Sequence, residues 1–314
     1  MSDMLNPFDR FDVWIKSASI VNRNKKLHSI KKFLHKKMAK RLFGNAFAQR
    51  NRAELQSTPK VARPFIKTKR PALESSWAKD AGEVQEAQRL RFKVFAEEMG
   101  ATLASHREGL DIDEFDAYCD HLIIRDEDTL RVVGTYRLLP PHKAREIGKL
   151  YSESEFDLSR LQHLRPKMVE VGRSCVHQDY RSGAVIMALW SGLAQYMLKN
   201  NYEIMLGCAS IPMTDGGHFA ASLYNGLNQN QIAPIECHGF PKIPLPLTRL
   251  NGDLDVEAPP LIKGYLKLGA KICSAPAWDP DFNTADLLTM LRLSEINPRY
   301  AKHFLGNKLS TDAS

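Results

Sequence analysis

The sequence predicts an α/β domain with a mixed sheet, and three observations support that fold class. Runs rich in β-branched residues alternate with amphipathic helical segments through residues 76–314. Two such runs, "DHLIIRD" at 120–126 and "RVVGTYRLL" at 131–139, are joined by "EDTL", which is typical of an antiparallel hairpin. The hydrophobic fraction of 43% over 314 residues is also large enough to bury a sizeable core.

A first helix precedes the hairpin, and a regular alternation of strands and helices follows it. Val84, Ala87 and Leu90 recur at helical spacing and predict a helix over residues 83–100. After the hairpin, the sequence predicts a strand at 168–176, a helix at 185–199, a strand at 203–210, a helix at 217–230 and a strand at 232–237. No internal repeat is present, so we assign these elements to one domain.

Residues 1–75 differ from the rest of the chain in charge and in pattern. Residues 1–80 contain 19 Lys and Arg against 6 Asp and Glu, while the remaining residues carry a net charge of −5. The segment at 24–44 predicts a basic amphipathic helix, whose lysine face suits an anionic membrane surface or an acidic protein. Packing of its apolar stripe on the main domain is the alternative. A linker with three prolines follows, and we expect the domain to begin at residue 76.

Cysteine usage and the N-terminal sequence bear on the compartment. Five cysteines are widely spaced and form no C-x-x-C pair, which favours a reducing cytoplasm over a disulfide framework or a structural zinc site. The first twelve residues contain three aspartates and lack the apolar core of a signal peptide. No apolar run reaches the ~18 residues of a membrane span. We expect a cytoplasmic protein, located on the inner face of the cytoplasmic membrane if residues 24–44 bind lipid.

The strand "MVEVGRSCV" carries two charges that regular alternation would place on opposite faces. Glu170 and Arg173 are three residues apart, and side chains alternate along a strand. Gly172 lies between them, and a glycine inside a strand often marks a β-bulge. A bulge here would bring both charges into one pocket and leave a strand amide free to bind a carbonyl oxygen. The alternative is a buried ion pair that serves only the fold.

The turn "QDYRSGA" leads from this strand into the following helix. The residues at the start of that helix are Arg181, Ser182, Gly183 and Ala184. Small residues there let a phosphate approach the free amides and the positive end of the helix dipole. Arg181 adds a charge-assisted donor. An ordinary helix cap would use the same small residues.

These stretches together resemble a known family. "LRFKVFAEEMGA", "DIDEFDAYCDHLII", "LYSESEFDL", "VEVGRSCV", "LGCASI" and "KICSAPAWDPDF" are similar to segments of the L-ornithine Nα-acyltransferases. These are GNAT-type N-acyltransferases related to acyl-homoserine lactone synthases, and the resemblance covers most of the chain after residue 75. It implies a GNAT fold and transfer of a 3-hydroxyacyl chain from an acyl carrier protein thioester to the α-amine of L-ornithine. The implied product is lyso-ornithine lipid, and no permanently bound cofactor is implied.

The resemblance also implies roles for single residues. Substrate binding is implied for Arg91, Phe95, Asp111, Asp113, Asp116 and Arg137. Catalysis is expected from Glu170, Arg173 and Ser174. Amide formation needs a base because free ornithine is mostly an ammonium ion at neutral pH, and Glu170 is the candidate. Arg173 is expected to hold a carboxylate or to orient Glu170, and an amide near Ser174 is expected to stabilise the oxyanion.

Two further groups of residues concern the substrates. Asp111 and Asp113 lie on one side of an extended segment and would attract a cationic side chain such as that of ornithine. A solvated acidic loop, or ion pairs with Arg91 or Arg137, is the alternative. The segment lacks the glycine and the distal glutamate of an EF-hand, so no metal site is predicted. Arg181 replaces the usual glycine of a GNAT turn, which suits the single phosphate of a phosphopantetheine arm.

Other functions remain as alternatives. Two are enzymatic: acyl-homoserine lactone synthesis and the synthesis of another N-acyl amino acid. A third is a non-catalytic, membrane-binding, haemolysin-like protein, which only the basic N-terminal segment supports. A nucleic-acid partner is not expected, because the main body is acidic and contains no recognised nucleic-acid module.

Overall fold

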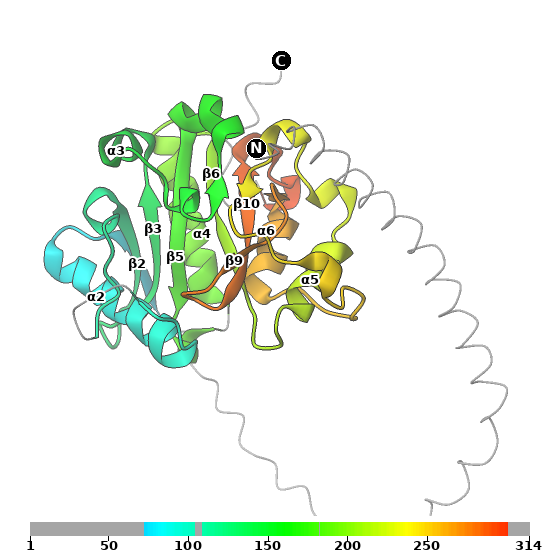
Figure 1. Cartoon of the computed structure of the whole chain (residues 1–314). Helices are drawn as coiled ribbons and strands as arrows, with labels where there is room; N and C mark the ends of the chain where they lie inside the picture. The colour runs from blue at the N-terminus through cyan, green and yellow to red at the C-terminus, as the bar shows by residue number, and fades with distance from the viewer. Residues whose placement is uncertain (1–71, 104–108, 182, 301–314) are drawn as a thin grey trace, which may run out of the picture. The chain divides into compact units, whose positions relative to one another are not determined.

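A mixed sheet organises the part of the chain that the computed structural model describes, residues 72–103, 109–181 and 183–300 (Figure 1). Its strands lie in the order β1-β2-β3-β5-β6-β10-β8, with β9 paired to β10, and among these strands only β5 and β6 run parallel. The strands are β1 (Leu73–Trp77), β2 (Asp120–Asp126), β3 (Val132–Leu139), β5 (Met168–Val176), β6 (Ile204–Pro212), β8 (Lys271–Ile272), β9 (Ala277–Asp279) and β10 (Thr284–Arg292), while β4 (Phe156–Asp157) and β7 (Phe240–Pro241) form a separate pair. The predicted α/β class with a mixed, mostly antiparallel sheet is confirmed.

Helices cover both faces of the sheet. The α-helices are α2 (Ala81–Phe92), α3 (Pro141–Ile147), α4 (Ala184–Lys199), α5 (His218–Gly226) and α6 (Pro260–Leu268), and a π-helical segment, η1 (Lys93–Glu98), continues α2. α2 crosses β2, β3 and β5 on one face, and α4 lies against β1, β2 and β3 on the opposite face (Figure 1). Asp80 caps α2, because its carboxylate accepts from the backbone amides of Gly82 and Glu83.

The largest apolar core lies between α4 and the sheet. Leu122 and Ile124 of β2 belong to it together with Val185 and Leu189 of α4, and all four are at most 1% exposed. Gly134 on β3 permits this packing, since a Cβ there would lie 2.3 Å from Val185. Burial of each such side chain contributes roughly 1.5–3 kcal/mol. The packing therefore holds the beginning of α4 firmly against β3.

The parallel ladder between β5 and β6 is short. It covers three residue pairs and ends at Glu170–Leu206, although each strand is nine residues long. Gly207 follows the last pair, and a Cβ there would come 2.2 Å from the Val171 carbonyl oxygen. Only glycine allows the two backbones to approach so closely at this point. Beyond it, the facing edges of two neighbouring strands become available to a ligand.

Most predicted elements are present, with small shifts of their ends. The predicted first helix is α2 with η1, and the predicted hairpin is β2 and β3. The strand, helix, strand and helix expected after the hairpin are β5, α4, β6 and α5. The predicted strand at residues 232–237 is wrong: Ile235–Cys237 form a 3₁₀ turn. Pro234 explains the difference, because it has no amide to donate to a ladder.

β1 was not predicted, and the predicted domain boundary between residues 75 and 76 falls within it. β1 pairs with the outer edge of β2, from Leu73–Asp126 to Trp77–Leu122. The sheet therefore includes residues that the sequence assigned to the linker. Residues 1–71, with the predicted membrane-binding segment at 24–44, lie outside the described residues. In the described part of the chain, no helix is both long and apolar enough to cross a membrane.

Candidate active site

A β-bulge interrupts β5 immediately after Gly172. Arg137 of β3 pairs with Gly172, and Thr135 pairs with Cys175, so three steps along β5 oppose two along β3. Arg173 carries the distortion, with a φ of 51°, a left-handed conformation that few non-glycine residues adopt. Such local strain is concentrated at functional sites. The predicted bulge is present, and it begins one residue after the glycine.

The bulge brings Glu170 and Arg173 to the same structural feature, η3 (Tyr151–Glu153). Glu170 accepts hydrogen bonds from the backbone of this segment. The Arg173 guanidinium carbon lies 5.0 Å from the centre of the Tyr151 ring and 4.8 Å from that of Phe282. The two charged groups thus share one pocket, as the sequence predicted, and each has its own set of partners.

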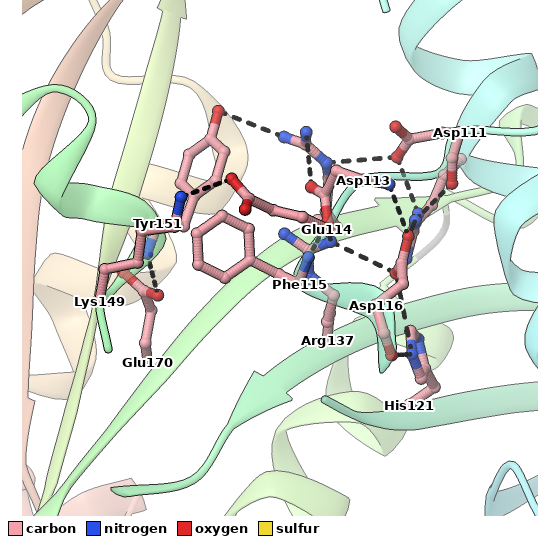
Figure 2. A network of polar contacts seen from close by, with 12 residues as sticks. Asp111, Asp113, Glu114, Phe115, Asp116, His121, Arg137, Lys149, Tyr151 and Glu170 are labelled. Atoms are coloured by element: carbon pink, nitrogen blue, oxygen red, sulfur yellow. Dashed lines mark hydrogen bonds and ion pairs between the residues drawn. The ribbon is translucent and has the colours of Figure 1, made fainter. Parts of the chain in front are cut away.

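Three acidic and three basic side chains form a buried network on this face of the sheet (Figure 2). We call it the paired cluster, and its members are Asp111, Asp113, Asp116, Arg91, Arg137 and Arg173. Arg91 is completely buried and lies 2.8 Å from the Asp111 carboxylate and 2.9 Å from the Asp116 carboxylate. Burial raises the pKa of Asp116, but the hydrogen bond and charge of Arg91 outweigh it and hold that pKa well below its usual range.

The paired cluster links α2 to β3 and to the bulge. Arg137 donates to Asp113 at 2.6 Å, and Arg173 Nη2 lies 3.2 Å from the same carboxylate. Arg173 Nε lies 3.2 Å from Asp111. Asp111 and Asp113 therefore meet one arginine from the same side, as their spacing predicted. Three carboxylates balance three guanidinium groups, so a cationic substrate would have to compete with an arginine for each of them.

Glu170 is buried at the end of the β5–β6 ladder. Its Oε2 accepts from the Tyr151 amide at 2.6 Å, while Oε1 accepts from the Ser152 amide at 2.7 Å and the Ser152 hydroxyl at 2.6 Å. Burial raises the pKa of Glu170, and these donors together with the charge of Arg137 oppose the rise. A buried carboxyl with a raised pKa and a hydroxyl beside it is suited to proton transfer near neutral pH.

A cavity of about 530 Å³ is lined by β5 and β6 beyond their last ladder pair. The three residues predicted to be catalytic, Glu170, Arg173 and Ser174, all line it. Of the residues predicted to bind substrate, Phe95 and Arg137 line it as well. Arg91 and the three aspartates belong to the paired cluster. Two other members of that cluster, Arg137 and Arg173, line the cavity.

The wall formed by α4 and α6 is apolar. Ile186 and Trp190 of α4 line the cavity together with Leu261 and Tyr265 of α6. The Trp190 and Tyr265 rings lie 5.9 Å apart. A Cβ at Gly264 would come 2.4 Å from the Trp190 ring, so this glycine lets the indole pack against α6. This end of the cavity is suited to a hydrocarbon chain.

Two buried tyrosine hydroxyls stand beside the bulge. The hydroxyls of Tyr136 and Tyr265 lie 2.5 Å apart, and Ser174 interacts with both. Burial raises the pKa of each tyrosine, which keeps both phenols protonated near neutral pH. All three side chains line the cavity. They are potential proton donors that the sequence did not reveal.

The predicted phosphate turn opens α4. Gly183 precedes the first helical residue, Ala184, in a left-handed conformation with φ of 98°. Arg181 and Gly183 line the cavity, and Ser182 lies outside the described residues. Arg181 is half exposed and already has partners: Nε donates to the Val176 carbonyl at 3.1 Å, and Nη2 lies 2.5 Å from Glu98.

Two further basic side chains lie near this turn. Lys93 Nζ and Arg131 Nη2 lie 3.1 and 3.0 Å from His177 Nε2, at the end of β5. Burial and these two positive charges lower the pKa of His177. Lys93, Arg131 and Arg181 therefore gather where β5 leads into α4, with Glu98 and Asp179 as the acidic groups beside them.

A second group of acids lies at the cavity. We call it the unpaired cluster, and it consists of Glu155, Asp279 and Asp286. Asp279 and Asp286 line the cavity, together with Cys208 and Ser210 of β6. In the described part of the chain, none of the three carboxyls forms an ion pair with Lys, Arg or His. The sequence did not single out these acids, although Glu155 and Asp279 lie in stretches that resemble the family.

Together, these features define the class of protein. The parallel strands β5 and β6 stop pairing partway along their length, and β5 carries a β-bulge. Gly183 precedes the helix α4 that follows β5, and this arrangement is typical of acyl-thioester sites. A family model described as an acetyltransferase (GNAT) domain matches residues 90–191. The protein is therefore a GNAT-type acyltransferase, and a non-catalytic role is set aside.

The relatives define the family. The L-ornithine N(alpha)-acyltransferase of Rhodobacter capsulatus is 36% identical over 240 residues, which cover 72% of this chain and 92% of that protein. The enzyme of the same name from Agrobacterium fabrum is 37% identical over 251 residues, covering 74% and 85%. The chain belongs to the L-ornithine Nα-acyltransferase family. Among solved structures, the AHL synthase LasI matches with a TM-score of 0.43 and 13% identity, over 75% of this chain and 96% of that chain.

Proposed function

We propose that this enzyme transfers an acyl chain from an acyl carrier protein thioester to the α-amino group of L-ornithine, which gives lyso-ornithine lipid. The observation that carries the proposal is the cavity beside β5 and β6, because it joins an apolar wall, the bulge and buried acids in one space. The names of the relatives supply the acceptor. A hydrocarbon chain and a short cationic amino acid require a cavity with one apolar and one polar end.

The donor arm enters at the start of α4. Its phosphate would approach the free amides after Gly183, where the helix dipole favours an anion. Arg181 reaches this phosphate by exchanging the Glu98 carboxylate for it. The positive charges of Lys93 and Arg131 nearby support a negatively charged carrier protein as the source of the arm.

The acyl chain occupies the apolar wall between α4 and α6. Ile186, Trp190 and Leu261 would surround it, with the thioester carbonyl near the bulge. A backbone amide between Gly172 and Ser174 stabilises the negative charge that develops on the carbonyl oxygen. This assignment rests on the ladder register, which skips Arg173 and Ser174.

Glu170 acts as the general base through the Ser152 hydroxyl. The hydroxyl lines the cavity and donates to Glu170 Oε1 at 2.6 Å. As the neutral α-amine attacks the thioester, its proton passes to Ser152 Oγ while the hydroxyl proton moves to Glu170. The departing thiolate takes a proton from the hydroxyl pair of Tyr136 and Tyr265. The amide bond forms and the carbon–sulfur bond breaks, with no oxidant or metal required.

The N-terminal segment brings the enzyme to the membrane in this proposal. Residues 24–44 hold 8 Lys or Arg and no Asp or Glu, which suits an anionic bilayer. Sedimentation of the full chain with phosphatidylglycerol vesicles, but not with phosphatidylcholine vesicles, is the expected result. Equal binding to both would remove the electrostatic role of the segment.

Incubation with defined substrates tests the function itself. The full chain is mixed with 3-hydroxyacyl carrier protein and a panel of amino acids, and the lipid product is identified by mass spectrometry. We expect acyl-ornithine acylated on the α-amine, formed faster from the carrier protein than from the matching coenzyme A thioester. Product with glycine or homoserine lactone instead of ornithine would overturn the acceptor, and equal rates with coenzyme A would overturn the donor.

A further inference from the structure

The unpaired cluster collects three carboxyl groups from two parts of the fold, the segment after η3 and the paired strands β9 and β10. Glu155 follows η3, Asp279 ends β9 and Asp286 lies on β10. Ligand atoms of Glu155, Cys208 and Asp286 all lie within 4.8 Å of one another. Buried carboxyl groups at this spacing repel each other when ionised, and such groups are normally paired with a cation.

The partners of these acids are few and neutral. Asp286 is 3% exposed and accepts from the hydroxyls of Thr284 at 2.8 Å and Ser210 at 3.2 Å. Asp279 accepts from backbone amides of the turn that follows it. Both carboxyl oxygens of Glu155 are buried, and the polar groups beside them are the Asp286 carboxyl and the Cys208 thiol. Buried acids that face one another without a cation are costly to ionise, which indicates that a positively charged ligand completes the group.

The position of the cluster relates it to the reaction centre. Cys208 Sγ lies 3.5 Å from the Ser152 hydroxyl, which in turn donates to Glu170. The same thiol lies within 4.8 Å of ligand atoms of Glu155 and Asp286. One short polar path therefore runs from the proposed base to the unpaired cluster, and the cavity follows it. A molecule with amines at both ends of a short aliphatic chain could contact both.

We propose that the unpaired cluster binds the terminal ammonium group of the amino-acid acceptor and thereby selects a diamino acid such as ornithine. This inference rests on the proposed function and assigns its acceptor site. The cluster also directs the reaction to the α-amine. A terminal amine held among carboxylates stays protonated and has no lone pair for attack, while the α-amine near Ser152 can lose its proton.

The pKa shifts of these acids agree with this assignment. Burial, and then the charges of Asp286 and Asp279, raise the pKa of Glu155 above its ordinary value, and burial raises that of Asp286. Cys208 and Tyr151 also face this group, and burial raises the pKa of both, so they add no charge near neutral pH. An entering ammonium ion would supply the positive charge that the carboxyls lack.

A divalent metal ion is the competing occupant, since one thiol and two carboxyls lie at ligand spacing. Burial, and then the charges of Glu155 and Asp286, hold the Cys208 pKa well above its usual range, which disfavours the thiolate that metals prefer. An ammonium ion requires no thiolate. The metal content of the purified full chain separates the two occupants.

Steady-state kinetics of the full chain tests the proposal. Glu155→Gln and Asp286→Asn keep the shape of each side chain and remove its charge, and Glu203→Gln, at an exposed site, is the matched control. We expect KM for ornithine to rise about tenfold or more in both variants, with KM for the acyl carrier thioester unchanged. Norvaline, which lacks the terminal amine, should react equally poorly with wild type and variants.

Each result decides a separate point. An unchanged KM for ornithine in both folded variants, or a stoichiometric metal ion whose removal abolishes activity, would overturn the acceptor site. Thermal unfolding of each variant shows that it is folded. Failure of the wild type to acylate ornithine at all would instead overturn the proposed function. Loss of ornithine binding with donor binding retained is the outcome that supports the cluster.

Discussion

The two acidic clusters of this enzyme are alike in size and burial but opposite in their partners. The paired cluster sets three carboxylates against Arg91, Arg137 and Arg173, whereas the acids of the unpaired cluster have hydroxyls, backbone amides, a thiol and one another as neighbours. Asp116 and Asp286 illustrate the difference. The pKa of Asp116 is lowered because arginine outweighs burial, while the pKa of Asp286 is raised mainly by burial.

The contrast separates holding the fold from recognising a ligand. A carboxylate that already has an arginine is part of the structure, and its removal leaves a buried charge without a counterion. A buried carboxylate without a counterion destabilises the folded protein, and a cation that binds beside it removes that destabilisation. The paired cluster therefore fixes the bulge and the position of Arg173, while the unpaired cluster provides the selective interaction.

The largest effect is expected at Glu170, which lies between the clusters. Glu170→Gln should lower kcat about 10²–10⁴-fold, because the amide has no capacity to take the amine proton. Thiol release from the acyl carrier thioester measures this, and circular dichroism checks the fold. Because burial raises the pKa of Glu170, the wild-type rate should increase with pH through a value above the ordinary glutamate range. Unchanged turnover in the variant would remove Glu170 from the mechanism.

Disruption of the paired cluster should affect stability strongly. Arg91→Met leaves the carboxylates of Asp111 and Asp116 without their fully buried partner, and we expect a loss of about 3–5 kcal/mol in the free energy of unfolding. Denaturant titration measures it, with the half-exposed Arg181→Met as the matched control. A loss below about 1 kcal/mol would show that the network is not a structural element.

The same substitution in the two clusters should have opposite effects on stability. Asp116→Asn should destabilise the protein above pH ~4, since its depressed folded-state pKa contributes stability that is lost only as pH falls through that pKa. Asp286→Asn should be neutral or stabilising by up to about 2 kcal/mol near pH 8, because a raised folded-state pKa makes the ionised group unfavourable at high pH. Unfolding curves across pH compare them, and destabilisation by both would contradict the contrast.

The smallest effect is expected at the donor end, outside both clusters. Arg181→Ala should raise KM for the acyl carrier thioester about 3- to 10-fold, because one exposed charge-assisted contact is lost. Glu98→Gln releases Arg181 from its present partner and should lower that KM slightly or leave it unchanged. Neither variant should alter KM for ornithine. An unaltered donor KM in Arg181→Ala would argue against the phosphate role.

The clusters also show what the sequence could and could not predict. The bulge was predictable because Glu170 and Arg173 break the period of two and a glycine lies between them. The helices α2, α4 and α5 and the hairpin followed from hydrophobic periodicity, whereas α3 and α6 were not predicted. β1 was not predicted because the preceding prolines indicated a linker. The run at residues 232–237 resembled a strand, but it forms a 3₁₀ turn after Pro234.

The acidic residues were harder to assign, for a physical reason. "DIDEFD" is conspicuous in the sequence, yet its charges are neutralised by arginines 20 or more residues away along the chain. Glu155 lies more than 120 residues before the β9–β10 hairpin that carries Asp279 and Asp286, so no local pattern joins all three. Whether a carboxylate has a counterion is a property of tertiary packing, so only the fold could distinguish the two groups.

The most direct test of this account is the preference of the enzyme for ornithine over norvaline, measured as the ratio of kcat/KM values. Wild type should prefer ornithine at least about tenfold. Asp286→Asn should bring the ratio towards one, whereas Asp113→Asn in the paired cluster should lower both rates and leave the ratio unchanged. A ratio that is unchanged in Asp286→Asn and falls towards one in Asp113→Asn would contradict the account. It would assign the ammonium group of the acceptor to the paired cluster.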